Sequence, residues 1–199
     1  PSVCGGMCMN KKIITICRSF GAEGHEIGKE LSERLNIPLY DKDLLEMAAR
    51  KSNLELNHAA TLDEQISKKI ISHYFLMSQD IESDRLFREE TNLIMQLVEK
   101  GSCIIVGRMA DYILRNRADC LKVFITAPYD VRVGIIKEKY GISAEEAGKT
   151  VRKMDTAREE FYRYYSNGKW RQETDKDIVL NRGIFGIKGC VDILEYICK

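Results

Sequence analysis

The amino-acid sequence predicts an α/β protein in which a parallel sheet is covered by helices on both faces. Two observations lead to this class. Short apolar runs at 13–17, 103–106 and 121–125 have the composition of strands that are buried on both faces. Stretches with helical spacing separate these runs, and strands that alternate with helices over such lengths form parallel sheets. With 199 residues, the chain is long enough for one well-buried domain.

The first strand and the first helix are predicted within residues 13–35. Residues 13–17 are mostly β-branched and form the strand. Further along, apolar residues recur at i, i+4 and i+8 and place one apolar stripe along a helix, at Ile27, Leu31 and Leu35.

The loop between this strand and this helix carries two glycines, Gly21 and Gly24. The first N–H groups of a helix lack intrahelical partners, and the helix dipole is positive there. A strand that leads through a tight loop into a helix therefore predicts a phosphate site, with an ordinary strand-to-helix turn as the alternative. The residues expected at the phosphate are Gly21, Ala22, Glu23, Gly24, His25 and Glu26.

The register of this loop matters for its chemistry. Residues 24–30 imitate the motif G-x-x-x-x-G-K-[ST], but they have one spacer residue too few, and Glu30 replaces the hydroxyl residue. Placing the loop at 21–24 instead keeps Ile27 in the helical stripe. This register puts Gly24 where a phosphate-loop lysine belongs and Glu26 where the metal-binding Ser or Thr belongs.

The middle of the chain is predicted to continue with a short strand at 37–40 and a helix capped by Asp41 or Asp43. Two further helices, at 63–77 and 82–100, each carry apolar residues on one side. The strands at 103–106 and 121–125 follow.

The C-terminal part is predicted to begin with a helix at 130–140. Gly141 then ends this helix, and Ser143 followed by acidic residues begins the next one. A strand at 177–181, a loop at 182–186 and a helix at 187–197 complete the chain.

Polar residues follow several of the predicted strands, namely Arg18, Asp41, Arg108 and Thr126. In parallel sheets, ligands bind beyond the carboxyl ends of the strands. We therefore expect these side chains to lie together at one edge of the sheet.

The long helix after Ser143 carries Arg152, Asp155 and Arg158 at i, i+3 and i+6. This spacing puts an aspartate between two arginines on one stripe. An aspartate in that place holds guanidinium groups in position, which suits closure over phosphates.

Composition excludes several classes of protein. Lys and Arg total 31 against 30 Asp and Glu, so no overall field favours nucleic acid or a membrane surface. The seven cysteines form no C-x-x-C pair, as in reduced cytosolic proteins, and Cys4 and Cys8 are expected in a flexible tail at 1–8. No apolar stretch is long enough for a bilayer and residues 1–8 lack signal-peptide features, so we expect a cytoplasmic protein.

A set of motifs in a fixed order resembles the cytidylate kinase-like family, a branch of the P-loop nucleoside monophosphate (NMP) kinases. The resemblance covers nearly all of residues 9–198. It is carried by the strand, loop and helix at 13–35, Tyr40-Asp41-Lys42, I-V-G-R-M-A-D-Y at 105–112, Asp155-x-x-Arg158 and Val179-Leu180-Asn181.

The resemblance implies a three-layer α/β/α, P-loop NTPase-like fold with a five-stranded parallel sheet. It further implies one domain at 9–199, with a helical NMP-binding insertion at about 43–100 and a mobile lid at about 140–172. It also implies transfer of the γ-phosphoryl group of ATP to CMP or dCMP, with Mg²⁺.

Residue roles follow from the same resemblance. The loop at 21–26 would hold the donor phosphates, and the loop after Asn181 would lie on the adenine side. Asp41, Lys42, Arg108 and Arg152 would bind the acceptor, while Arg18, His25, Asp155 and Arg158 would serve catalysis.

The chain departs from the family at three positions. Cytidylate kinases have a lysine in place of Gly24, a hydroxyl residue in place of Glu26 and an aspartate in place of Val106. Arg18 or His25 is then the expected source of positive charge, and Glu26 the expected ligand of Mg²⁺. A nucleotide-binding protein without turnover and a kinase for another small acceptor are the alternative functions.

Overall fold

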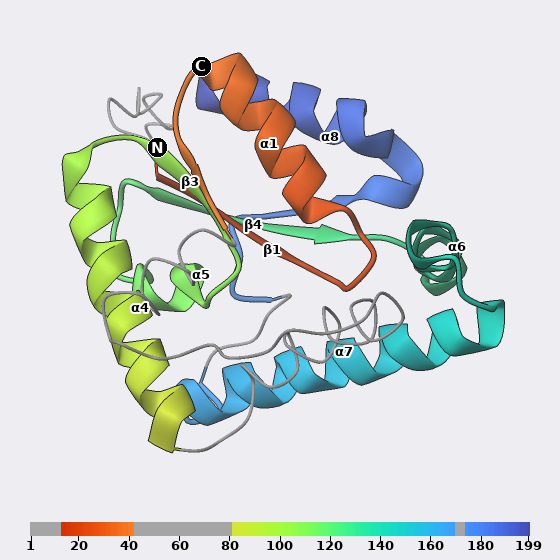
Figure 1. Cartoon of the computed structure of the whole chain (residues 1–199). Coiled ribbons are helices and arrows are strands. Elements are labelled where there is room, and N and C mark those ends of the chain that lie inside the picture. Colours follow the sequence, from red (N-terminus) through yellow and green to blue (C-terminus); the bar gives the residue numbers. More distant parts are fainter. Residues whose placement is uncertain (1–12, 42–80, 170–173) are drawn as a thin grey trace, which may run out of the picture.

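The computed structural model describes residues 13–41, 81–169 and 174–199, and Figure 1 shows their arrangement. Within these ranges, five strands form one parallel sheet in the order β2-β3-β1-β4-β5. The predicted α/β class with a five-stranded parallel sheet is therefore confirmed. The strands are β1 (Ile13–Arg18), β2 (Leu39–Tyr40), β3 (Cys103–Val106), β4 (Cys120–Thr126) and β5 (Ile178–Asn181).

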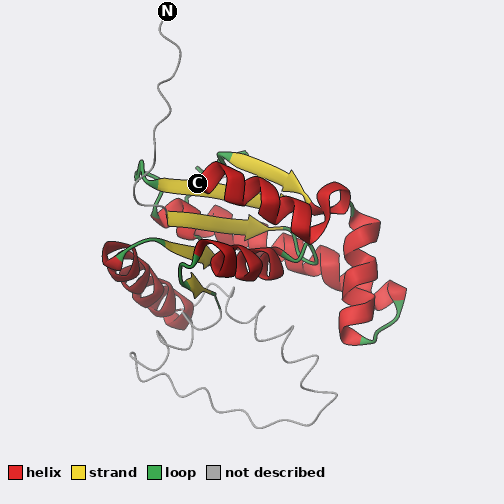
Figure 2. Cartoon of the chain, turned by 90° about the horizontal axis from the view of Figure 1, so that it is seen from above, coloured by secondary structure: helices red, strands yellow, loops and turns green. Residues whose placement is uncertain are grey.

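Helices cover both faces of this sheet, as Figures 1 and 2 show. On one face lie α1 (Gly24–Leu35) and α8 (Arg182–Cys198). On the other lie α4 (Ile81–Lys100), α5 (Ala110–Ile113) and α7 (Ala144–Tyr165). At the carboxyl end of β4, α6 (Tyr129–Tyr140) leads into α7. The three-layer arrangement is that expected from the sequence.

The central strand β1 contributes to the core on both faces. Ile14 and Ile16 pack with residues of α1 and α8, whereas Ile13 packs with residues of α4. Because successive side chains of a strand point to opposite faces, a strand covered on both sides needs apolar residues throughout. This explains the nearly continuous apolar run that identified the strand, in which the hydroxyl of buried Thr15 donates to the Leu121 carbonyl.

The register of the sheet brings the strand ends together. Arg18 at the end of β1 lies opposite Ile125 of β4, and Thr126 lies opposite Asn181 of β5. On the other side, Ile16 pairs with Val106. The loops that leave these strands therefore share one edge of the sheet.

Several element boundaries differ from the prediction. The prediction of a loop at 182–186 is wrong. The helix α8 begins at Arg182, and its helical geometry is interrupted only at Gly186, where φ is 67°. The Asn181 side chain accepts a hydrogen bond from the Gly183 N–H and so starts the helix one residue after β5. The short helix α5 was not predicted.

Other predictions about elements are confirmed or lie outside the described residues. Ser143 and Glu146 form the capping box expected at the start of α7, and α4 covers the helix predicted at 82–100. Lys42, the tail at 1–8, and the helices predicted after Asp43 and at 63–77 lie outside the described residues. Among the helices that are described, none is long and apolar enough to span a bilayer.

Candidate functional site

The end of β1, the loop that follows it and the first turn of α1 form one wall of a pocket of about 180 Å³. The opposite wall comes from the C-terminal half of α6, and Arg158 of α7 closes one side. The lining residues are Arg18, Ser19, Phe20, Gly21, Glu23, Gly24, His25, Glu26, Ile135, Ile136, Lys139, Tyr140 and Arg158. The structure thus places nearly all of the predicted phosphate loop around one hollow.

The start of α1 lies in this wall. Glu23 is its N-cap residue in the left-handed region, at φ 54°, and its side chain makes no capping hydrogen bond. Gly24 and His25, the first helical residues, line the pocket. N–H groups at these positions have no acceptor within the helix, so the wall suits an anion.

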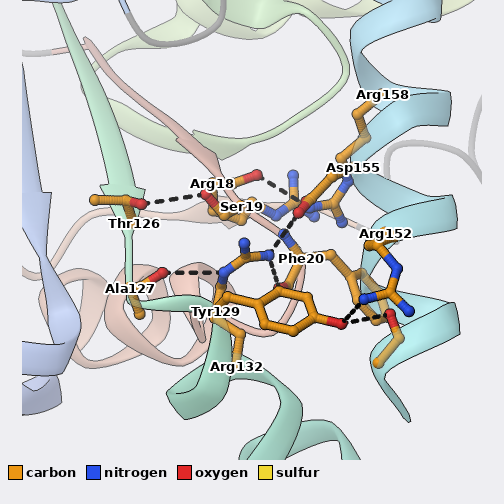
Figure 3. Close-up of polar contacts among 11 residues, drawn as sticks. Arg18, Ser19, Phe20, Thr126, Ala127, Tyr129, Arg132, Arg152, Asp155 and Arg158 are labelled. Atoms are coloured by element: carbon orange, nitrogen blue, oxygen red, sulfur yellow. Dashed lines mark hydrogen bonds and ion pairs between the residues drawn. The ribbon is translucent and has the colours of Figure 1, made fainter. Parts of the chain in front are cut away.

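Two neighbouring helices hold the loop backbone, as Figure 3 shows. The Phe20 N–H donates to Asp155 Oδ1 at 2.8 Å, and Arg132 Nη1 donates to the Phe20 carbonyl at 3.0 Å. Arg132 also pairs with Asp155 at 2.5 Å and bonds the Ala127 carbonyl through Nε. Charge-assisted hydrogen bonds of this kind are strong, so α6 and α7 fix the position of Phe20.

This geometry corrects one expectation about α7. Asp155 was predicted to hold Arg152 and Arg158. Its charge does act on Arg158, but the guanidinium group that donates a hydrogen bond to it is that of Arg132 from α6. Arg152 instead donates to the Tyr129 hydroxyl. Helical spacing identified the stripe, but it gave no information about which arginine of another helix would face it.

Arg158 lies beneath the loop and is nearly fully buried. It donates from Nη1 to the Arg18 carbonyl at 3.0 Å and stacks over the Phe20 ring. Burial, and then the positive charge of Arg18, lower the pKa of Arg158, although Asp155 opposes this shift. Two guanidinium groups near each other in a partly desolvated site are stabilised when an anion binds between them.

The Arg18 side chain runs across two glycines. A Cβ added at Gly24 would lie 2.8 Å from Arg18 Cβ, and one added at Gly107 would lie 2.1 Å from Arg18 Nη1. Gly107 also has φ +79°, which side chains rarely adopt. Arg18 therefore needs glycine at both positions, and it occupies the space that the first carbon of a lysine at position 24 would need.

Asp41 brings the end of β2 to the same place. His25 Nδ1 lies 2.6 Å from Asp41 Oδ2, and Arg18 Nη2 lies 3.8 Å from Asp41 Oδ1. Ser19 and Thr126 are also in contact, with their hydroxyl oxygens 3.3 Å apart. Of the residues predicted to meet after the strand ends, Arg18 and Asp41 therefore lie together, and Thr126 contacts Ser19, the neighbour of Arg18.

Both carboxylates of the loop have cationic partners from distant parts of the chain. Glu26 accepts a hydrogen bond from Lys139 Nζ at 2.9 Å, and Glu23 pairs with Arg182. Burial raises the pKa of Glu26, but the Lys139 ammonium and the residue's own backbone N–H outweigh it, so the pKa lies below its usual value. Lys139 was not predicted as a site residue, because it belongs to none of the motifs, and Arg182 was predicted only as the start of the loop after Asn181.

Arg108 lies at the end of β3 in a strained backbone. Arg108 and Met109 both have positive φ, at 56° and 52°. Arg108 Nε lies 3.5 Å from Oε1 of Glu90, a buried residue of α4 that sequence reasoning missed. Burial raises the pKa of Glu90, and Arg108 only partly opposes this. Non-glycine residues held in the left-handed region cluster at functional sites.

Comparison with known proteins agrees with this geometry. A sequence model of the cytidylate kinase-like family matches residues 13–184. A cytidylate kinase from Sulfolobus acidocaldarius is 28% identical over 150 residues, which are 73% of this chain and 71% of that protein.

Solved structures show the same fold. An uncharacterised protein from Eubacterium ventriosum superimposes with a TM-score of 0.71 at 27% identity, covering 94% of this chain and 98% of the other. A shikimate kinase from Bacteroides thetaiotaomicron has a TM-score of 0.56 at 15% identity, covering 94% and 97%, and so is similar in fold alone. Taken with the family match over most of its length, these findings show that the chain belongs to the cytidylate kinase-like family.

Proposed function

We propose that this protein transfers the γ-phosphoryl group of ATP to a nucleoside monophosphate, with CMP and dCMP as the first candidates. Membership of a kinase family supports nucleotide phosphotransfer as the chemistry. The choice of acceptor comes from the resemblance of the sequence motifs. The observation that carries the proposal is the path of the Arg18 side chain.

Arg18 replaces the missing lysine in this proposal. Phosphoryl transfer depends mainly on positioning and on neutralising charge at the transferred group. The Arg18 side chain begins at the donor loop, crosses Gly24 and reaches Gly107 beside the acceptor edge. A guanidinium group there can contact phosphate oxygens of both substrates, and it presents a fork suited to them.

The other site residues have complementary roles. N–H groups at the start of α1 and Arg158 bind the donor phosphates, while Asp155 and Arg132 keep the loop in shape. Asp41 orients Arg18 and His25 and, with Arg108, faces the acceptor. Holding both substrates in one geometry supplies much of the rate of such reactions.

The pocket also fits Mg²⁺ bound together with a nucleotide. Magnesium in kinases takes one or two carboxylates and completes its shell with phosphate oxygens and water. Glu26, whose side chain is 36% exposed in the pocket wall, would hold it. The ion would neutralise charge on the phosphates. In the part of the chain that is described, no cluster of three or more metal-binding side chains forms a separate site.

The test is ADP release from Mg-ATP across a panel of monophosphates, with the wild type beside Arg18→Ala and Arg158→Ala. Arg163→Ala is the matched control, because Arg163 is exposed on the outer side of α7. We expect transfer to CMP or dCMP, reduced roughly 10²- to 10³-fold in the two site variants, as for other charge-stabilising groups. Transfer that is equal in Arg18→Ala and wild type would contradict the role of Arg18.

A nucleotide-binding protein without turnover is the second candidate. Glu23 and Glu26 place two carboxylates in a loop that would bind a polyanion, and Val106 replaces the family's aspartate. This candidate predicts saturable ATP binding with no ADP release for any acceptor. Release with an acceptor other than a pyrimidine nucleotide would instead identify a kinase for a different small molecule.

A further inference from the structure

We propose that Lys139 of α6 supplies an ammonium group to the nucleotide phosphates, and that Glu26 holds this group in place until a nucleotide binds. This inference rests on the phosphate site of the proposed function, and it deepens that function. It does not require that the protein catalyse transfer.

The position of Lys139 is the first support. Its Nζ lies 2.9 Å from Glu26 Oε1, and both residues line the pocket together with Gly24 and His25. In a usual phosphate loop the ammonium comes from the helix that follows the loop. Here it would come from the opposite wall, which α6 provides.

The weakness of the ion pair is the second support. The Lys139 and Glu26 side chains are 52% and 36% exposed, and exposed ion pairs contribute little to stability. Lys139 can therefore leave the Glu26 carboxylate for a phosphate group with little loss of free energy. A lysine is also suited to such a movement, since its charge lies at the end of a flexible four-carbon chain.

The electrostatics of the loop are the third support. Glu26 lies in the first turn of α1, so without a cation its carboxylate would repel a polyanion at the same helix terminus. Lys139 removes this repulsion while the site is free of nucleotide. When triphosphate binds, a larger negative charge attracts the same ammonium more strongly.

The competing explanation is that the Lys139–Glu26 pair only joins α1 to α6. The two explanations predict different changes in nucleotide affinity when either residue is substituted. If the pair only joins the helices, Lys139→Met and Glu26→Gln each break it and change nucleotide affinity in the same direction or not at all. If Lys139 binds phosphate and Glu26 competes for it, the two substitutions change affinity in opposite directions.

The experiment measures binding of metal-free ATP and of inorganic tripolyphosphate by calorimetry in EDTA at fixed ionic strength. Omitting the metal removes any contribution of Glu26 as a ligand of Mg²⁺. We expect Lys139→Met to weaken binding at least tenfold and Glu26→Gln to strengthen it about threefold, while Lys139→Arg keeps most of the affinity. Thermal unfolding of each variant, followed by circular dichroism, checks that it is folded.

Matched controls for both substitutions are available on α6, next to Lys139. Lys137 and Glu138 are exposed on α6, and neither lines the pocket. Lys137→Met and Glu138→Gln change the net charge by the same amounts as the test variants. We expect both to bind within twofold of the wild type.

The outcomes separate this inference from the proposed function. Equal affinities in Lys139→Met and wild type, equal-direction changes in the two site variants, or no binding by the wild type would overturn the inference. If the opposite shifts occur but no acceptor yields ADP, the inference stands and the transferase assignment fails. If ADP is released with Lys139→Met as efficiently as with wild type, the assignment stands and the inference fails.

Discussion

Arg18 and Gly24 are a complementary pair of residues at the centre of the site. The Arg18 side chain passes over Gly24, where an added Cβ would lie 2.8 Å from Arg18 Cβ. Contacts this short occur only if one group moves. A side chain at position 24 and the side chain of Arg18 would therefore compete for the same space.

Restoring the lysine alone should damage the protein. We expect Gly24→Lys to lower the free energy of unfolding by about 1–3 kcal/mol, because the new side chain overpacks against Arg18. Adding Arg18→Gly should recover part of this loss, with a coupling of about 0.5–3 kcal/mol in a double-mutant cycle. Urea unfolding measures both. Gly134→Ala is the control, since no atom lies within 4 Å of its added Cβ. Additive effects of the two substitutions would contradict the packing argument.

Glu90, which lies beside Arg108, gives the stability of the fold a dependence on pH. Burial raises the folded-state pKa of Glu90 above its value in the unfolded chain, although Arg108 opposes this. Protonated Glu90 therefore fits the fold, and its favourable contribution is present below the unfolded pKa and is lost as pH rises through the folded pKa.

Glu90→Gln should remove this dependence. The difference in unfolding free energy, wild type minus variant, is expected to fall as pH rises above the ordinary glutamate pKa of about 4.3. Other carboxyl groups with lowered pKa values, such as those of Glu26 and Glu195, remain in both proteins and cancel. A difference that rises with pH would show that the ionised form of Glu90 is the one the fold stabilises.

Some of these residues were predictable from the sequence and others were not. Arg18, His25 and Asp41 follow strands or sit in the first loop, so the rule for parallel sheets identified them. Arg132, Lys139 and Glu90 lie on helices whose facing residues depend on how each helix docks. The apolar residues of α6 follow no clear stripe, so the sequence contained no signal for its orientation.

At the scale of elements, one buried polar network joins four segments behind the site. Tyr162 of α7 donates to Asp111 of α5 at 2.7 Å, and its oxygen lies 2.7 Å from Cys17 Sγ of β1. Lys176, just before β5, pairs with Asp111 at 2.7 Å, and both side chains are fully buried. The network therefore ties α7 to the sheet directly behind the pocket.

Breaking the pair in this network should be costly. We expect Lys176→Met to lower the free energy of unfolding by about 3–5 kcal/mol, because it removes the buried ammonium group that lies 2.7 Å from the Asp111 carboxylate. Lys122→Met is the control, since Lys122 pairs at 3.6 Å with the more exposed Asp177 and should cost about 1 kcal/mol or less. Chemical denaturation measures both. If both variants lost the same unfolding free energy, the argument that the buried pair costs more to break than the exposed pair would be wrong.

The elements themselves were predictable where local chemistry fixes them. The capping box at Ser143 and the apolar runs of β1 and β3 depend on neighbours in the sequence, so they were identified correctly. The turn after Asn181 was not, because its glycines suggested a loop while the Asn181 side chain caps a helix. The hydrogen bond from the Gly183 N–H to the Asn181 side chain starts a helix where the glycines suggested a loop.

At the scale of the whole molecule, the fold follows from β1 at the centre of the sheet. Its neighbours β3 and β4 come from later in the chain, and this order puts the first loop between the ends of both. The class could be predicted from periodicity, whereas the identity of the facing walls could not. The pocket therefore combines a predictable loop with an unpredictable partner, α6.

Binding of nucleotide should stabilise the entire domain. A ligand that binds only the folded state adds about 2.7 kcal/mol at 100 times its Kd. For a chain of 199 residues this corresponds to a rise in Tm of roughly 5–10 °C. Differential scanning fluorimetry with ATP measures it, and Arg158→Ala should show a smaller rise at equal ATP. Because a kinase and a non-catalytic binder both predict this rise, Tm tests the pocket alone and ADP release decides between them. An unchanged Tm at millimolar ATP would contradict both and leave the pocket without a nucleotide.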